Sequence, residues 1–218
     1  MQHEQSFADI FNRYMNRQAL IRGCAFYSFS LDGQDRDIGA DYLLTNSDRF
    51  SIVEFKYMEK DLTSENRKTR RLVLCKKLEK NFTMESYHDS CHFISWSDKD
   101  SGEVVTNVYR HEICNQSVFG ESCGLKDKLP QVDKRISLKL FSEKFFSHFN
   151  EMSLSREDFE EYVEWVLRDT SGSTKSQLQL IAFNPDSDSI ALVKINSLTE
   201  AQQWVNDHFT PPSSSFRP

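Results

Sequence analysis

Glycine and proline are scarce in this sequence. Seven Gly and five Pro among 218 residues are too few for a collagen-like or low-complexity chain. Apolar residues still make up 38% of the chain, and Phe alone occupies 17 positions. This supply of apolar side chains excludes a wholly disordered protein and suits one domain, or one domain with a small appendage.

Long hydrophobic runs are also missing. No stretch approaches the roughly 20 apolar residues that a membrane helix requires. Residues 1–18 lack the basic, apolar and small-residue order of a signal peptide. We therefore expect a cytoplasmic protein without membrane contact. Its five cysteines, an odd number with irregular spacing, are then expected to be free thiols.

Positive charge is in deficit overall, because 27 Lys and Arg face 33 Asp and Glu, which gives a net charge of −6. A protein that bound polyanions with its whole surface would be basic. Any contact with nucleic acid therefore has to come from a local basic strip. A Walker-type phosphate loop is missing as well, since the pattern G-x-x-x-x-G-K-[ST] does not occur.

Hydrophobic periodicity predicts a mixture of helices and strands. Apolar residues recur every three or four positions in segments that predict amphipathic helices, at 6–22, 157–168 and 199–209. Short apolar segments bounded by polar turns predict strands, at 24–31, 38–44, 50–57, 92–96, 103–109, 178–183 and 190–195. Residues 111–130 indicate a long loop, and the state of residues 136–150 stays open.

A further helix is expected over residues 65–80, which contain neither Gly nor Pro. Seven basic residues oppose two acidic ones in this segment, a local charge of +5. Phosphate contacts by Lys and Arg supply affinity that does not depend on base sequence. The segment is therefore the candidate nucleic-acid strip. The expected contacts are Arg67, Lys68, Arg70 and Arg71.

Two carboxylates and one amine are expected to converge on the strands at 38–44 and 50–57. Strand side chains alternate between faces, so Glu54 and Lys56 point one way while Phe55 points the other. If the two strands pair as a hairpin, Asp41 faces Glu54. Hard oxygen ligands suit Mg²⁺ or Mn²⁺, and a lysine there could activate a water or neutralise developing charge.

The order of helix, strand, Asp41 strand, Glu54-Phe55-Lys56 strand and basic helix resembles the core of the PD-(D/E)xK, or restriction-endonuclease-like, nuclease superfamily. The resemblance covers roughly residues 4–97. It implies that Asp41 and Glu54 hold the divalent metal and that the main-chain carbonyl of Phe55 adds a ligand. It also implies that Lys56 is the third catalytic residue.

Further positions bear on this resemblance. Ala40 stands where the family pattern has Pro before the aspartate. Many members carry a glutamate in the first helix, for which Glu4 and Asp9 are the candidates. Many also place a polar or basic residue on the helix after the lysine, facing the site, and Lys68 and Arg71 are the possible matches. The histidines and cysteines at 88–92 and 111–114 lack the paired C-x-x-C spacing of zinc sites, so core or loop positions are expected for them.

The expected fold is α/β (α+β), a central mixed sheet flanked by helices. It would combine a restriction-endonuclease-like core at 1–130 with a C-terminal extension at 131–210, which contains a β-hairpin and a helix and serves dimerisation or partner docking. Residues 211–218 would form a flexible tail.

The resulting functional interpretation is a nuclease that hydrolyses the phosphodiester bonds of DNA through a water activated by Mg²⁺ or Mn²⁺. RNA as substrate, the choice between endo- and exonuclease action, and a homodimer or partner subunit stay open. The alternative is a catalytically inactive nuclease-like fold that acts as a protein-interaction subunit of a nucleic-acid-processing or defence complex. The net acidity and the acidic helix at 157–164 fit that alternative.

Overall fold

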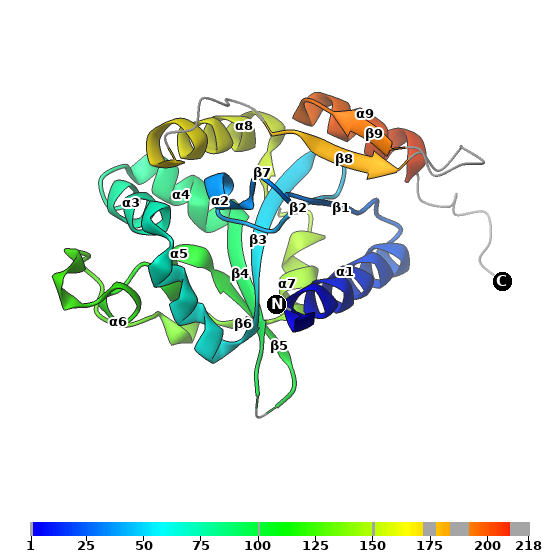
Figure 1. Ribbon diagram of the computed structural model, residues 1–218. Helices are drawn as coiled ribbons and strands as arrows, with labels where there is room; N and C mark the ends of the chain where they lie inside the picture. The colour runs from blue at the N-terminus through cyan, green and yellow to red at the C-terminus, as the bar shows by residue number, and fades with distance from the viewer. Residues whose placement is uncertain (1, 100, 150, 172–177, 184–191, 210–218) are drawn as a thin grey trace.

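A mixed seven-stranded sheet forms the centre of the computed structural model (Figure 1). The structure describes residues 2–99, 101–149, 151–171, 178–183 and 192–209. The strands of the sheet are β1 (Tyr27–Ser30), β2 (Tyr42–Thr45), β3 (Arg49–Met58), β4 (His92–Ser97), β5 (Val104–Val108), β6 (Ile136–Ser137) and β7 (Leu154–Ser155). They lie in the order β1-β2-β3-β4-β5-β6, and β7 pairs with the beginning of β3. β3 and β4 are parallel, and the other described neighbours in this sheet are antiparallel.

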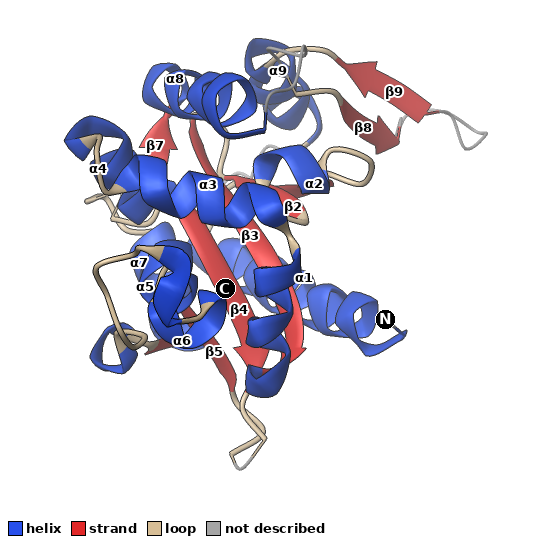
Figure 2. Cartoon of the chain, turned by 60° about the vertical axis from the view of Figure 1, so that its left-hand side comes forward, coloured by secondary structure: helices blue, strands red, loops and turns tan. Residues whose placement is uncertain are grey.

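Helices cover both faces of the sheet (Figures 1 and 2). On one face, α1 (Gln2–Arg22) and α7 (Leu138–Phe145) pack aromatic side chains against Val53 and Phe55 of β3. The opposite face packs Ile52 and its neighbours against a second set of helices. These helices are α2 (Asp35–Ile38), α3 (Thr69–Leu78), α4 (Phe82–Cys91) and α8 (Arg156–Trp165). The fold is therefore α/β with a mixed sheet between two helical layers, which confirms the expected class.

The predicted hairpin is present and sets the position of Asp41. β2 and β3 pair antiparallel with Tyr42 opposite Val53, and the Asp41 N–H donates to the Val53 carbonyl at 2.9 Å. Side chains along β3 alternate as predicted, because Ile52 belongs to one core cluster while Val53 and Phe55 belong to the other.

The strand expected at 38–44 begins later than predicted. Residues 35–38 form α2 instead, and Gly39 ends this helix in the left-handed region at φ +88°. Such a conformation favours glycine, which has no Cβ to clash with the following backbone. The chain then turns through Ala40 into β2, so Asp41 lies just before the strand.

The predicted helix at 65–80 is wrong in its first part. The chain forms a 3₁₀ segment, η1 (Glu59–Arg67), and α3 begins only at Thr69. Lys68 between them has extended backbone angles, φ −97° and ψ 93°. A single helix continued through this break would point the basic side chains in other directions than those in which they lie.

The long loop expected at 111–130 is also wrong, because much of it is helical. It contains α5 (Tyr109–Ile113), α6 (Gln116–Phe119) and η2 (Glu121–Cys123). The undecided segment at 136–150 contains β6 and α7, and η3 (Val132–Lys134) precedes it. Asn115 and Ser137 accept hydrogen bonds from backbone N–H groups at the starts of α6 and α7, which explains where these helices begin.

A separate antiparallel pair, β8 (Leu180–Phe183) with β9 (Leu192–Ile195), precedes α9 (Leu198–His208). The predicted hairpin and helix are therefore present. The turn expected at 184–189, the first two residues of the strand expected at 190–195 and the tail expected at 211–218 lie outside the described residues. Trp204 of α9 packs on Tyr27 and Phe29 of β1. A π-helical segment, η4 (Val166–Ser171), ends α8. Since β6 and β7 join the central sheet, that sheet extends beyond the expected boundary at residue 130.

The expectation of five free thiols is wrong for two of the cysteines. Cys75 of α3 and Cys114 at the end of α5 form a disulfide, with Cα atoms 5.2 Å apart. Cys24, Cys91 and Cys123 are free. Among the described helices, none combines the length and the apolar content needed to cross a membrane.

Candidate active site

The strand β3 carries two buried charged side chains on the same face. Glu54 is 1% exposed and Lys56 is 5% exposed, and the Lys56 ammonium is paired with Glu54 Oε1. Burying charges is costly unless they are paired and hydrogen-bonded. The spacing of two residues, which brings both onto one face of a strand, satisfies this condition.

A third charged residue, Glu65 of η1, completes the arrangement and was not predicted from the sequence. Its side chain is fully buried, and Oε1 lies 2.9 Å from the ammonium of Lys56 and 2.7 Å from that of Lys68. Lys68 also lies 2.8 Å from Glu54 Oε1. Both lysines are therefore shared between Glu54 and Glu65. The one sequence signal for Glu65 is an acidic residue at the start of a basic run.

Electrostatics keep this cluster ionised. Burial alone would lower the pKa of Lys56, but Glu54 and Glu65 outweigh it and hold the pKa above the usual value. Burial alone would raise the pKa of Glu65, but Lys56, Lys68 and Arg71 together hold it well below the usual range. Lys56 and Glu65 are therefore ionised at neutral pH.

Asp41 lies beside β3 and meets its backbone. Its Oδ2 accepts a hydrogen bond of 2.6 Å from the Phe55 N–H. Burial, followed by the negative charge of Glu54, raises the pKa of Asp41 to about 7, while the Phe55 N–H, Lys56 and Lys68 lower it in part. The negative charge of Glu54 therefore acts on the carboxylate of Asp41.

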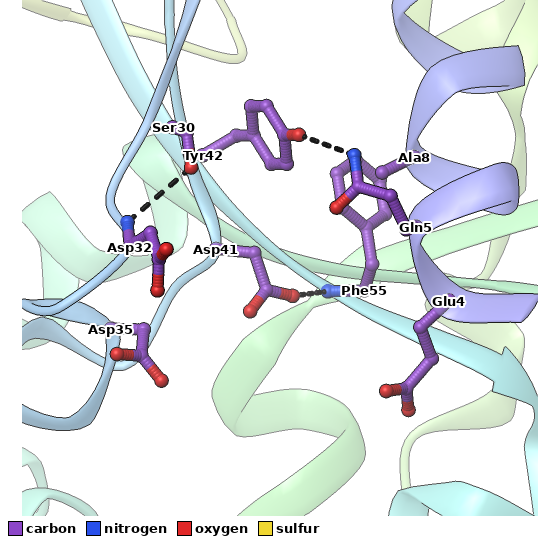
Figure 3. A pocket seen from close by; sticks show the side chains of 9 residues that line it. All are labelled: Glu4, Gln5, Ala8, Ser30, Asp32, Asp35, Asp41, Tyr42 and Phe55. Carbon is purple, nitrogen blue, oxygen red and sulfur yellow. Dashed lines mark hydrogen bonds between the residues drawn. The ribbon is translucent and has the colours of Figure 1, made fainter. Parts of the chain in front are cut away.

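A cavity of about 200 Å³ opens in front of Asp41 (Figure 3). Its wall includes the carboxylates of Glu4, Asp32 and Asp35 from α1 and from the residues preceding β2. Of the two first-helix candidates, Glu4 lines this cavity. Asp9 does not line it and accepts a hydrogen bond from Gln5 instead.

Glu54 and Lys56 do not line this cavity. Phe55, which lies between them on β3, does. Glu54 and Lys56 point into the buried ion-pair cluster, so Asp41 faces more open space than its two expected partners.

Two carboxylate oxygens of this cluster are buried without a hydrogen bond among the described residues, but one of them, Glu65 Oε1, has the ammonium groups of Lys56 and Lys68 as ion-pair partners. Glu54 Oε2 is buried without a hydrogen-bond partner among the described residues, while Oε1 receives both lysines. A buried unsatisfied carboxylate oxygen is costly and calls for a cation or a bound water. Within the described ranges, no group of three or more His, Cys, Asp or Glu side chains is arranged to hold a metal. A shared metal site of Asp41, Glu54 and the Phe55 carbonyl therefore stays a prediction from the sequence.

Comparison with known proteins gives no relative. No family model, curated protein or solved structure matches the chain. The nuclease-like resemblance therefore rests on the sequence pattern alone.

Of the residues expected in the nucleic-acid strip, Arg71 is buried, so the expectation of a DNA contact is wrong for it. Arg71 is 2% exposed, and its guanidinium contacts Glu65 and the main-chain carbonyls of Asp35 and Arg36. It ties η1 to α2 and is not available to DNA. The side chain of Lys68 is 38% exposed but paired with Glu54 and Glu65.

The remaining basic side chains of this region face solvent. Arg67 is exposed, and Arg70 is exposed but paired with Asp37. Lys76, Lys77 and Lys80, which were counted in the basic run, are also exposed. The accessible cations therefore follow η1 and α3, next to the half-exposed Lys68.

A chain of buried hydrogen bonds supports the backbone that leads to Asp41. The Arg110 N–H donates to His88 Nε2, so Nδ1 of His88 carries the proton and donates to the Tyr162 hydroxyl. That hydroxyl donates to His92 Nδ1, and His92 Nε2 donates to the Gly39 carbonyl at 2.8 Å. Burial lowers the pKa of both histidines, and that of His92 falls to about 3. These histidines are structural core residues, in line with their expected placement.

Proposed function

We propose that this protein is a metal-dependent nuclease that hydrolyses phosphodiester bonds of DNA. The observation that carries the proposal is the geometry on β3. Glu54 presents an unsatisfied buried oxygen next to a paired lysine, and Asp41 binds the neighbouring backbone N–H. Carboxylates that can hold a divalent metal, with an ammonium group beside them, suit metal-assisted hydrolysis of a phosphodiester.

Each side chain has a distinct role in this proposal. Asp41 and Glu54, with the Phe55 carbonyl, would hold Mg²⁺ or Mn²⁺, which supplies Lewis-acid polarisation and a water of lowered pKa. Lys56 orients Glu54 through its ion pair and adds positive charge where negative charge develops. The half-exposed Lys68 is placed to meet a phosphate oxygen that approaches from solvent.

The exposed cations of η1 and α3 would guide the nucleic-acid backbone. Arg67, Lys76, Lys77 and Lys80 give this surface a positive charge on a chain whose net charge is −6. Neutralising phosphates releases counterions, so affinity should fall with added salt. Replacing Arg67, Lys76 and Lys77 by Gln should weaken DNA binding and reduce the salt slope by about one per lost phosphate contact.

The test of catalysis is cleavage of plasmid DNA, linear DNA and RNA by the purified protein with Mg²⁺ or Mn²⁺. We expect cleavage by the wild type and its loss in Glu54→Gln and Lys56→Met. Glu112→Gln is the matched control, because Glu112 is also a buried carboxylate, 2% exposed, and pairs with Arg135. Cleavage that survives in Glu54→Gln would contradict the assignment of the site.

The protein-interaction alternative predicts a different result. Lys56 and Glu54 are buried and paired with each other, an arrangement that can also be purely structural. A wild type that cleaves no substrate with either metal, while it binds nucleic acid or a partner protein, would favour that alternative.

A further inference from the structure

The carboxylate of Glu65 joins the candidate site to the scaffold, because its two oxygens have separate partners. Oε1 receives Lys56 and Lys68, at 2.9 and 2.7 Å. Oε2 accepts a 2.7 Å hydrogen bond from the Tyr109 hydroxyl and lies 3.3 Å from Arg71 Nε. One oxygen therefore faces the site, while the other is fixed by groups outside it.

The groups on the scaffold side are themselves held firmly. Tyr109 is fully buried at the start of α5, and Arg71 is 2% exposed. Arg71 also donates to the carbonyls of Asp35 and Arg36 in α2, close before the Asp41 position. The same guanidinium thus fixes Glu65 and the segment that leads to Asp41.

The lysines depend on this anchor for their position. Lys68 belongs to the break between η1 and α3, and its long side chain is 38% exposed. A lysine side chain has four rotatable bonds and loses considerable rotamer entropy when it is held in one place. Two carboxylate oxygens, Glu54 Oε1 and Glu65 Oε1, hold the ammonium of Lys68 in place. With only one of these oxygens, the ammonium would be free to move into solvent.

We propose that Glu65 is a positioning residue that holds the ammonium groups of Lys56 and Lys68 against Glu54. The catalytic meaning of this role rests on the proposed nuclease function, while the positioning itself does not. Glu65 is fully buried and out of reach of DNA, so its loss should act through the two lysines and chiefly slow the chemical step.

The kinetic test compares Glu65→Gln, Glu65→Asp and the control Glu112→Gln in cleavage of DNA with Mn²⁺. For Glu65→Gln we expect kcat to fall by about 10- to 100-fold with little change in KM, because displaced catalytic groups cost rate rather than affinity. Glu65→Asp keeps the charge and should recover part of kcat. Glu112→Gln should keep the wild-type kcat, whatever its effect on stability.

A second test needs no activity. Acetic anhydride labels free lysines, and mass spectrometry of the metal-free protein reports each site separately. In the wild type we expect Lys68 to be labelled more slowly than the exposed Lys76 and Lys77. Glu65→Gln should raise Lys68 labelling several-fold, and Glu112→Gln should not.

The two tests separate the two proposals. Wild-type protein that cleaves no DNA overturns the nuclease proposal and leaves labelling to decide the role of Glu65. If Lys68 is labelled in the wild type as fast as Lys76, or if Glu65→Gln changes neither labelling nor kcat relative to Glu112→Gln, the positioning role is overturned. The wild-type comparison holds even if Glu65→Gln fails to fold.

Discussion

Replacing Asp41 by asparagine is expected to stabilise the folded chain at alkaline pH. Burial and the charge of Glu54 raise the pKa of Asp41 from 3.8 to about 7. Between these values the folded chain keeps a proton that the unfolded chain has released, so the stability contributed by this group falls as the pH rises. Above pH 7 the full cost of the ionised carboxylate is present.

The size of the effect follows from that pKa. At about 1.4 kcal/mol per pH unit, a rise from 3.8 to about 7 corresponds to about 4 kcal/mol. Asp41 is half-buried and lines a cavity, so solvent screens part of this cost. We therefore expect about 2 kcal/mol. The amide oxygen of asparagine still accepts from the Phe55 N–H, so the variant keeps that hydrogen bond.

The assay is urea unfolding of wild type and Asp41→Asn at pH 4 and pH 8 without divalent metal. We expect nearly equal free energies of unfolding at pH 4, and the variant to be more stable by about 2 kcal/mol at pH 8. Asp207→Asn, on an exposed position of α9, controls for the loss of one carboxylate charge. A variant that is less stable than the wild type at both pH values would refute the reasoning, since the carboxylate would then be favourable where it lies.

Other parts of the structure give three more predictions. Cys75→Ser removes a disulfide that spans 39 positions. Its loss should lower the free energy of unfolding by about 4 kcal/mol under non-reducing conditions. Equal stability of variant and wild type in urea would show that the bond does not form. Gly39→Ala should destabilise the folded chain more than Gly33→Ala. Both glycines have positive φ, but only a Cβ at Gly39 would lie 2.8 Å from a guanidinium nitrogen. Equal urea midpoints of the two variants would contradict this. The pKa of His92 falls to about 3, so below pH 6.5 the unfolded chain takes up a proton that the folded chain does not, and the free energy of unfolding falls as the pH drops towards 3. His92→Gln should make the free energy of unfolding in urea depend less on pH over this range. An unchanged pH dependence would argue against a buried neutral histidine.

The hairpin and its charged face were predictable because local rules decide them. Alternation along β3 is a property of any strand, so the separation of Glu54 and Lys56 from Val53 and Phe55 follows from sequence alone. The polar turn between two apolar segments fixes the pairing of β2 with β3 in the same way.

Other features depend on tertiary contacts that no local rule reports. Arg71 was expected on the surface because arginine is seldom fully buried, yet Glu65 and two main-chain carbonyls satisfy it inside. The helix break at Lys68 has no Gly or Pro to announce it. The disulfide joins residues far apart in the chain, and spacing alone cannot select that pair among five cysteines.

The charge balance around β3 bears on the proposed contact with nucleic acid. Two buried carboxylates, Glu54 and Glu65, face three cations, Lys56, Lys68 and Arg71. Asp41 beside them has a pKa of about 7, so the cluster has one positive charge in excess while Asp41 is protonated and none once it is ionised. Buried ion pairs are weak stabilisers compared with apolar side chains of the same volume. Lys68 brings the excess charge to the surface, because its side chain is 38% exposed. An anion that approaches from solvent would balance the cluster at that point, and the phosphate of a nucleic acid is the anion that the neighbouring exposed cations would also attract.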